Sequence, residues 1–82
     1  MKITLSLYAT LRDYLPTDSG GKAVLDLAFA ATISQALAAV GVPVALAHII
    51  LVNGRHVLRP DVSARQLTEG DHLAVFPAIG GG

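Results

Sequence analysis

The sequence predicts a single α+β domain in which one helix packs on one face of a mixed sheet. Apolar and polar residues alternate near both ends of the chain, which is typical of half-buried strands. One central segment has helical spacing with its own start and stop signals. The 82 residues are enough for one hydrophobic core, so we expect one domain without internal repeats.

The first two strands are predicted from period-two alternation. The first is expected over residues 2–8, whose inward face carries Ile3, Leu5 and Leu7. The second is expected over residues 23–29, with Leu25, Leu27 and Phe29 on one face and Asp26 on the other. Residues 16–21 between them are rich in Pro, Asp, Ser and Gly, so they are expected to form a loop.

The clearest local signal is a helix over residues 33–40. Thr32 and Gln35 fit a capping box, in which each side chain bonds to the other residue's backbone N–H. Gly41 follows as the expected C-terminal cap, and Pro43 prevents continuation. A helix this short is unstable alone, so we expect it to pack on the sheet.

The remaining strands follow the helix. Residues 48–53 form an apolar run on both faces, so the face away from the helix must meet something else. Asn53-Gly54 is the preferred pair for a tight hairpin turn, and residues 55–58 are the expected return strand. After a turn over residues 67–71, the last strand directs Leu73 and Val75 inward and His72, Ala74 and Phe76 outward. Two hairpins flanking one helix is the layout of a β-grasp, or ubiquitin-like, domain.

Composition excludes several functional classes. The formal net charge is zero and 15% of residues are charged, which argues against nucleic acid as a partner. No apolar run reaches membrane-spanning length and no signal peptide is apparent, so we expect a cytoplasmic protein without a membrane partner. There is no cysteine. The hydrophobic content of 52% predicts exposed apolar surface for a protein partner, unless the many alanines alone account for it.

The chain ends in Gly80-Gly81-Gly82 directly after an apolar strand. Glycine has no Cβ, so such a terminus can enter a channel too narrow for other residues. This suits a protein whose own C-terminal carboxylate reacts, although terminal glycines are often only linkers or disordered ends. We therefore expect residues 1–77 to form the domain and residues 78–82 to form a flexible tail.

Four stretches together resemble the ubiquitin-like sulfur carriers of the MoaD/ThiS type, and most of all the small subunit of molybdopterin synthase. The stretches are residues 7–12 (Leu-Tyr-Ala-Thr-Leu-Arg), 31–37, 52–54 and 67–77, followed by the ending Phe-Pro-x-x-x-Gly-Gly. The chain departs from the family in having Ala78 where a second proline is common, and a run of three glycines. Both changes make the tail less stiff.

The resemblance implies that a ubiquitin-activating-type adenylyltransferase uses ATP to adenylate the Gly82 carboxylate. Sulfur from a persulfide donor then gives a thiocarboxylate, which the large subunit of molybdopterin synthase uses in molybdenum cofactor biosynthesis. The chain would bind no cofactor and would not itself be an enzyme, because the catalytic residues would lie on its partners. Gly82 would carry the sulfur and Gly81 would give clearance.

The expected partner-binding residues are Phe76, Pro77, Ile79 and Gly80. Phe76 is the expected anchor, the alternative being that it caps the core. Arg12 is a candidate for pairing with an acid on a partner, or a solvated charge without a role. Three histidines, His48, His56 and His72, do not have the spacing of a metal motif, so no metal site is expected.

Three alternative functions stay open. The first is a sulfur carrier for another product, such as thiamine, cysteine or a thiolated tRNA. The second is a ubiquitin-like modifier whose Gly82 is joined to lysines. The third is a plain β-grasp interaction module whose Gly-rich ending has no role.

Overall fold

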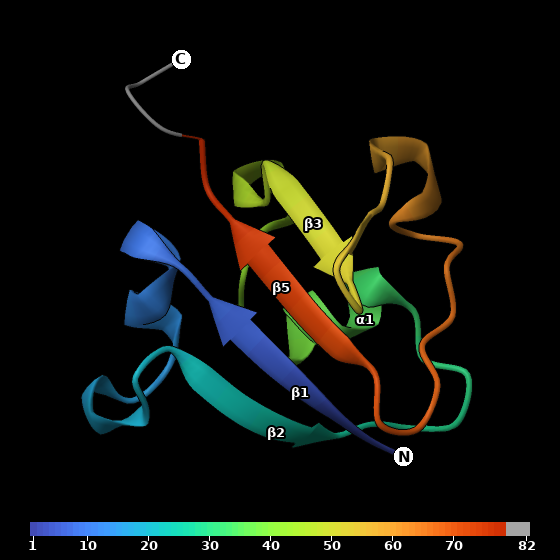
Figure 1. Cartoon of the computed structure of the whole chain (residues 1–82), viewed down its shortest axis with the longest axis horizontal. Coiled ribbons are helices and arrows are strands. Elements are labelled where there is room, and N and C mark those ends of the chain that lie inside the picture. The colour runs from blue at the N-terminus through green and yellow to red at the C-terminus, as the bar shows by residue number, and fades with distance from the viewer. Residues whose placement is uncertain (79–82) are drawn as a thin grey trace.

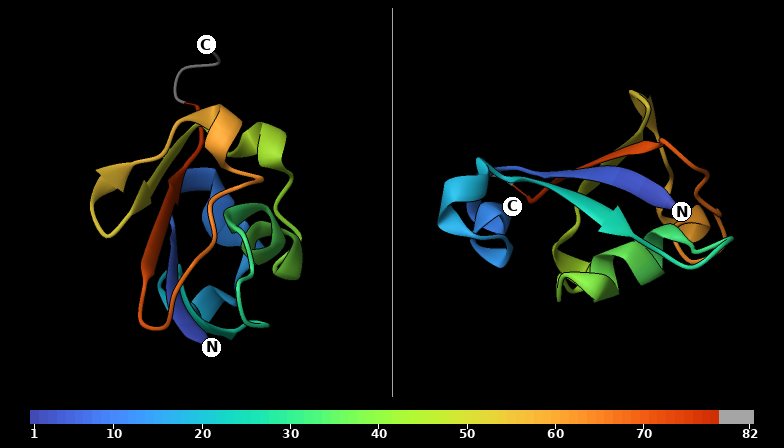
Figure 2. Two further views of the ribbon diagram at one scale, coloured as in Figure 1. Left: turned by 90° about the vertical axis from the view of Figure 1, so that its right-hand side faces the viewer. Right: turned by 90° about the horizontal axis from the view of Figure 1, so that it is seen from below.

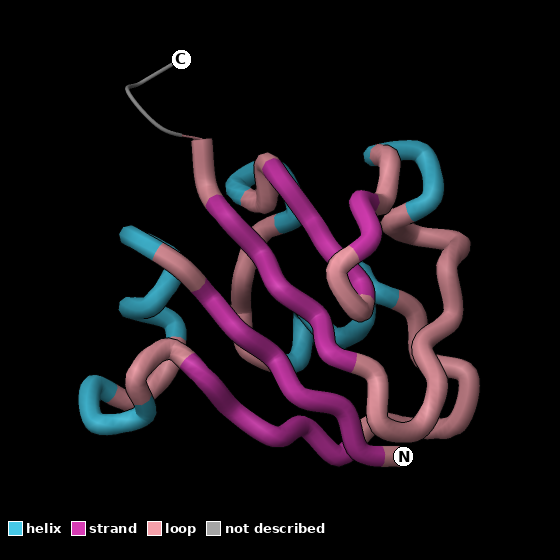
Figure 3. Tube along the Cα trace, viewed as in Figure 1, coloured by secondary structure: helices cyan, strands magenta, loops and turns pink. Residues whose placement is uncertain are grey.

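The computed structural model describes residues 1–78, and these form one five-stranded mixed sheet with one α-helix on one face (Figures 1 and 3). The predicted β-grasp class is confirmed. In chain order the elements are β1 (Lys2–Leu7), β2 (Lys22–Asp26), α1 (Ile33–Ala39), β3 (Ile49–Val52), β4 (Arg55–His56) and β5 (His72–Phe76). The predicted residues Ile79, Gly80, Gly81 and Gly82 lie outside the described residues.

The strands lie in the order β2-β1-β5-β3-β4, so the last strand of the chain is the central strand of the sheet. β5 runs parallel to β1, with Leu5 opposite Leu73, and antiparallel to β3, with Ile50 opposite Val75. The two hairpins, β1–β2 and β3–β4, are antiparallel. β5 is therefore hydrogen-bonded along both edges.

The helix begins where the capping box predicted. The Thr32 side chain accepts a hydrogen bond from the Gln35 N–H at 3.3 Å, and the Gln35 side chain accepts one from the Thr32 N–H at 2.8 Å. The helix ends at Ala39, and Gly41 then adopts a positive φ of 80°, the left-handed conformation expected after a helix end.

The core lies between the sheet and α1, as the alternation predicted. Its fully buried members include Ile3, Leu5, Ile33, Leu37, Leu73 and Val75. Leu11, from a 3-10 helix over Ala9–Tyr14 that follows β1, and Leu15, directly after that helix, also join it. The sheet thus has one face covered by α1 and one face without a helix, which Figure 2 shows from two sides. This second face is called the open face below.

The prediction for the second strand was wrong at its C-terminal end. β2 ends at Asp26, and Phe29 is 93% exposed instead of sharing the inward face with Leu25. The chain leaves the sheet after Asp26 and turns through Ala30, whose φ is 65°. Once the backbone leaves the pleat, period-two alternation no longer fixes which way a side chain points.

Two other boundaries differ slightly from the predictions. The return strand β4 has two residues rather than the four expected, and part of the predicted loop at residues 16–21 is a 3-10 helix, Thr17–Ser19. Within residues 1–78, no helix is both long and apolar enough to cross a bilayer.

Candidate functional site

The open face bears an apolar patch where β5 ends. Ile49 lies opposite Phe76 and Leu51 lies opposite Ala74 in the β3–β5 register. Tyr8, at the end of β1, stacks on Phe76 with ring centroids 4.2 Å apart and an interplanar angle of 8°. We call these five residues, Tyr8, Ile49, Leu51, Ala74 and Phe76, the tail-proximal patch. They lie beside the position from which Pro77 and Ala78 continue.

Phe76 faces away from the core, as its strand position predicted. Its neighbours Leu73 and Val75 are fully buried under α1, whereas Phe76 is partly exposed on the open face. It therefore does not cap the core. Its ring is held by Tyr8, and its carbonyl accepts a hydrogen bond from the His48 N–H at 2.8 Å.

The tail-proximal patch is partly exposed to solvent in the part of the chain that the structure describes. Ile49 is 42% exposed and Tyr8 is 39% exposed, which is unusual for large side chains so close to a core. The apolar run at residues 48–53 already indicated a second face that must meet something else, but Tyr8 was not proposed as a site residue from the sequence. Its alternation with Thr4 and Ser6 is the signal that places it on this face.

The base of the tail is held on both sides. The Tyr8 N–H donates to the Val75 carbonyl at 3.2 Å, and the His48 N–H donates to Phe76 from the other neighbouring strand. A strand end bonded to two neighbours cannot fray as an edge strand does. Pro77 and Ala78 thus leave the domain from a fixed point.

A hydrogen-bonded Ser–His pair lies on the open face next to the patch. The Ser6 hydroxyl and His72 Nε2 are 2.7 Å apart. Ser6 is only 1% exposed, so a substrate cannot reach its oxygen. Within residues 1–78 no carboxylate bonds to the His72 ring, so the pair is a satisfied polar contact between β1 and β5.

The nearest buried carboxylate, Asp71, serves the turn before β5. It accepts hydrogen bonds from the Thr68 N–H and from Asn53 Nδ2, both at 2.9 Å. Burial alone would raise the pKa of Asp71, but these hydrogen bonds outweigh it and lower the pKa. Glu69 likewise accepts from the Lys2 N–H at 3.0 Å. The turn interpretation of Glu69-Gly70-Asp71 is therefore confirmed.

Asn53 has a role that the sequence did not reveal. Besides donating to Asp71, its Oδ1 accepts from the His72 N–H at 2.8 Å. Its φ of 52° and that of Gly54, 82°, are the left-handed angles that a tight Asn-Gly turn requires. One side chain thus joins the β3–β4 turn to the start of β5.

The histidines are distributed over the sheet. His48 precedes β3, His56 lies on β4 and His72 starts β5, where it bonds to Ser6. Among residues 1–78, no three His, Asp or Glu side chains are grouped as metal ligands would be. Arg12 is exposed on the 3-10 helix after β1.

Among solved structures, two proteins of Haloferax volcanii have the same fold over the whole of this chain. The HVO 2177 protein is 27% identical with a TM-score of 0.76, and the match covers 87% of that chain. SAMP1 is 25% identical with a TM-score of 0.69, and the match covers 100% of that chain.

A third structure supports the fold alone. It is a Pyrococcus furiosus protein assigned as molybdopterin converting factor subunit 1, 19% identical with a TM-score of 0.67. The match covers 95% of this chain and 98% of that one. The ubiquitin-like architecture of MoaD/ThiS-type proteins is therefore shared across these structures.

No curated protein matches the sequence. A family model does, and it extends over residues 1–80, described as Mut7-C ubiquitin. That range includes all five strands, α1 and the tail-proximal patch. The chain therefore belongs to the Mut7-C ubiquitin family of ubiquitin-like domains.

Proposed function

We propose that this protein is a sulfur carrier that works through its C-terminal carboxylate, and that it supplies sulfur for molybdopterin as the small subunit of a synthase. The observation that carries the proposal is the position of β5. The central strand of the sheet leads, through Phe76 and Pro77, into the sequence that ends in Gly81-Gly82. A rigid domain followed by residues without side chains suits delivery of a terminus into another protein.

The proposed chemistry is adenylation followed by sulfur transfer, and partners catalyse both. An oxygen of the Gly82 carboxylate attacks the α-phosphorus of ATP, and pyrophosphate leaves. Sulfur then attacks the acyl carbon, and AMP leaves. Hydrosulfide gives the thiocarboxylate directly, whereas a persulfide gives an acyl disulfide, from which a thiol releases the thiocarboxylate by reducing the S–S bond. Gly81 would leave the approach to the acyl carbon clear.

The tail-proximal patch supports a docking role for the partners. Exposed aromatic and aliphatic side chains that cluster beside a reactive segment are typical of an interface centre. Phe76 and Ile49 would anchor the activating enzyme, a ubiquitin-activating-type adenylyltransferase, and then the large subunit of the synthase. Pro77, Ile79 and Gly80 would line the path between this patch and the reactive end.

A second candidate function is protein modification, in which Gly82 is joined to a lysine amine. The likeness to SAMP1 of Haloferax volcanii over the whole of both chains favours it, since SAMP1 is a small archaeal modifier protein. Both candidates share the adenylation step. They differ in the nucleophile that takes the acyl group, and sulfur delivery to other products such as thiamine uses the same thiocarboxylate.

The test is the intact mass of the protein after incubation with ATP, sulfide and a matching activating enzyme. We expect the mass gain of one sulfur-for-oxygen exchange, localised to the C-terminal peptide. A variant lacking Gly81 and Gly82, which no longer ends in Gly-Gly, is the matched control and should gain nothing. If the full chain also gains nothing while the enzyme activates its own known carrier, the sulfur-carrier proposal is wrong.

A second measurement separates the two candidates. Extracts incubated with the activated protein are searched for peptides bearing a Gly-Gly remnant on lysine. Abundant adducts without a stable thiocarboxylate would favour modification. A stable thiocarboxylate that restores dithiolene formation by a synthase large subunit would favour the molybdopterin role.

A further inference from the structure

The outer edge of β2 is unpaired. β2 lies at one end of the strand order, and Figure 1 shows no other element along its outer side. Val24, in its middle, is 67% exposed, and the Asp26 side chain is 76% exposed. An edge of this kind offers a row of backbone donors and acceptors to another strand.

The hydrogen bonds to β1 establish which residues of β2 face that edge. The Leu27 N–H donates to the Met1 carbonyl at 2.7 Å, and the Leu7 N–H donates to the Gly21 carbonyl at 2.7 Å. Bonded pairs alternate along an antiparallel ladder, so the odd-numbered residues of β2 bond to β1. The N–H and C=O groups of Lys22, Val24 and Asp26 therefore point outward.

The same three residues are self-complementary in charge. In an antiparallel pair of β2 strands centred on Val24, Lys22 of each chain lies opposite Asp26 of the other. In this register the outward-pointing backbone groups of Lys22, Val24 and Asp26 pair with outward-pointing backbone groups of the second copy. The two Val24 side chains then lie side by side at the two-fold axis. Opposite charges and β-branched residues directly across from one another both stabilise a strand pair.

We propose that β2 pairs with β2 of a second copy of this chain, which joins the two sheets into one continuous sheet across a two-fold axis. The charges define both orientation and register. A parallel pair would put lysine opposite lysine and aspartate opposite aspartate, and a shift by two residues would leave the charges without their partners. The interface is isologous and closes at two copies.

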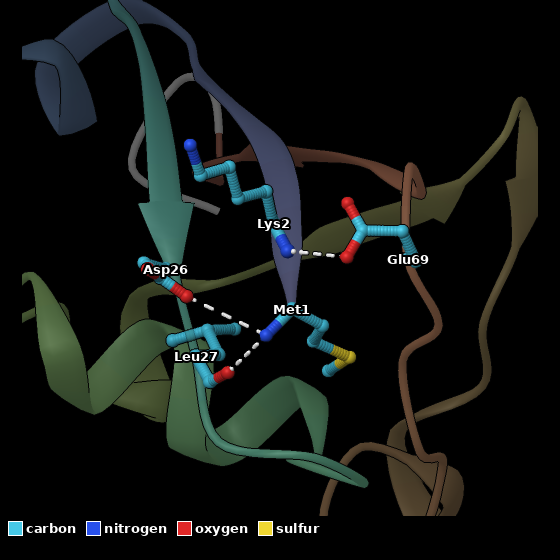
Figure 4. Close-up of polar contacts among 5 residues, drawn as sticks. All are labelled: Met1, Lys2, Asp26, Leu27 and Glu69. Atoms are coloured by element: carbon cyan, nitrogen blue, oxygen red, sulfur yellow. Dashed lines mark hydrogen bonds and ion pairs between the residues drawn. The ribbon is translucent and has the colours of Figure 1, made fainter.

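Asp26 is available for this contact. Its carboxylate lies 3.4 Å from the Met1 terminal ammonium, at the long end for an ion pair, and the same ammonium donates to the Leu27 carbonyl at 2.6 Å (Figure 4). A carboxylate has two oxygens and can accept from Lys22 of the second copy as well. Within residues 1–78, Lys22 forms no ion pair.

The opposite edge of the sheet does not offer such a surface. β4 consists of only Arg55 and His56, so its edge is short and carries no carboxylate to pair with a lysine or arginine of a second copy. Four residues of the tail-proximal patch lie on β3 and β5, on the far side of β1 from β2, and only Tyr8 lies near Lys22, with which it lines one pocket. The proposed dimer does not need the C-terminal carboxylate, so its test can fail without affecting the sulfur-carrier proposal.

Sedimentation of the full chain tests the proposal. A five-residue strand pair is a small interface, so we expect a weak dimer that forms between about 10 µM and about 1 mM protein. Lys22→Glu creates two Glu–Asp contacts and Asp26→Lys creates two Lys–Lys contacts across the axis. Each variant alone should weaken the dimer by about tenfold or more.

Mixing the two variants supplies the decisive control. The Lys22→Glu chain carries two carboxylates on the edge and the Asp26→Lys chain carries two ammonium groups, so an equimolar mixture should dimerise again. The double variant Lys22→Glu/Asp26→Lys should dimerise by itself. An amide spectrum of each variant confirms that the fold is intact.

Hydrogen exchange locates the interface. The N–H of Val24 should become protected as concentration rises, whereas Ala23 and Leu25, bonded to β1, stay protected throughout. A chain that remains monomeric to about 1 mM would overturn the proposal. The proposal would also be overturned by a dimer whose affinity neither Lys22→Glu nor Asp26→Lys changes. The same holds if the exchange rate of the Val24 N–H does not depend on protein concentration.

Discussion

At the residue scale, Gly21 shows why two adjacent glycines are not equivalent. Its φ is 79°, and a Cβ there would lie 2.6 Å from the Leu7 carbonyl oxygen and 3.1 Å from Arg12 Cγ. Gly20 has a similar φ of 68° but open space around it. Gly21 therefore needs both its conformation and its lack of a side chain, because the backbone of residue 21 packs directly on β1.

We expect Gly21→Ala to lower the free energy of unfolding by about 3 kcal/mol and Gly20→Ala by only about 1 kcal/mol. In Gly21→Ala the backbone is strained and the new Cβ must displace the Leu7 carbonyl, whereas in Gly20→Ala only the backbone is strained. Urea unfolding of the two variants measures the difference. Equal losses would mean that the close approach to Leu7 has no energetic weight.

Asp71 makes the stability of the domain depend on pH. The lowered pKa of Asp71 means that the folded state favours the charged carboxylate more than the unfolded chain does, where the pKa of this group is about 3.8. The contribution is complete above that value and is lost as pH falls through the lower, folded value. Below pH of about 4 the wild type should therefore lose stability.

The variant Asp71→Asn should flatten this acid dependence while costing about 1 kcal/mol at neutral pH, because a neutral acceptor bonds less strongly to Thr68 and Asn53. Unfolding free energies of both proteins between pH 7 and acid conditions test this. Parallel curves for the two proteins would assign the acid sensitivity to other carboxylates.

At the scale of elements, the Tyr8–Phe76 stack joins the ends of two parallel strands. A double-mutant cycle with Tyr8→Ala and Phe76→Ala should give a coupling of about 1 kcal/mol in unfolding free energy. The stacked geometry, with rings 4.2 Å apart, is the reason for expecting coupling beyond the buried area. Additive losses would show that the rings only share a surface.

The patch on these strand ends should matter more for partner binding than for folding. Ile49→Asp is expected to leave the unfolding free energy within about 1 kcal/mol, because Ile49 is 42% exposed, yet to raise the KM of the activating enzyme for this protein. Leu58→Asp is the matched control, since Leu58 is 61% exposed outside the patch. Equal effects of the two variants would remove the patch from the interface.

The elements that the sequence predicts correctly are those fixed by residues close together in the chain. Thr32 and Gln35 are three residues apart, so the capping box and the helix start could be predicted without any tertiary information. The inward positions of Leu73 and Val75 follow from alternation alone. Phe29 was placed wrongly because alternation continued in the sequence after the backbone had left the sheet at Asp26.

The parts of the site that were missed depend on contacts between distant segments. Asn53 and Asp71 are 18 residues apart, and Ser6 and His72 are 66 residues apart, so no local pattern announces either hydrogen bond. Tyr8 and Phe76 come together only because β1 and β5 pair in parallel. Predicting them would have required the strand order, not only the strands.

At the scale of the whole molecule, two surfaces serve separate proposed purposes. The tail-proximal patch lies at the ends of β1, β3 and β5, and the free edge lies on β2 at the side of the sheet. A partner enzyme bound to the tail-proximal patch need not displace a second copy of the chain bound at the β2 edge. Wild type and Lys22→Glu should therefore be loaded with sulfur at similar rates at about 1 mM protein, where the wild type is expected to dimerise more than the variant.

The central position of β5 also has a mechanical consequence. When an enzyme grips the end of the chain and pulls along the strand, the load acts in shear on the ladders to β1 and β3 together. Bonds loaded in this way must break together, whereas an edge strand can be peeled away one bond at a time. The domain should therefore resist unfolding by a force applied at its C-terminus. A partner enzyme could then pull on the tail without unfolding the domain.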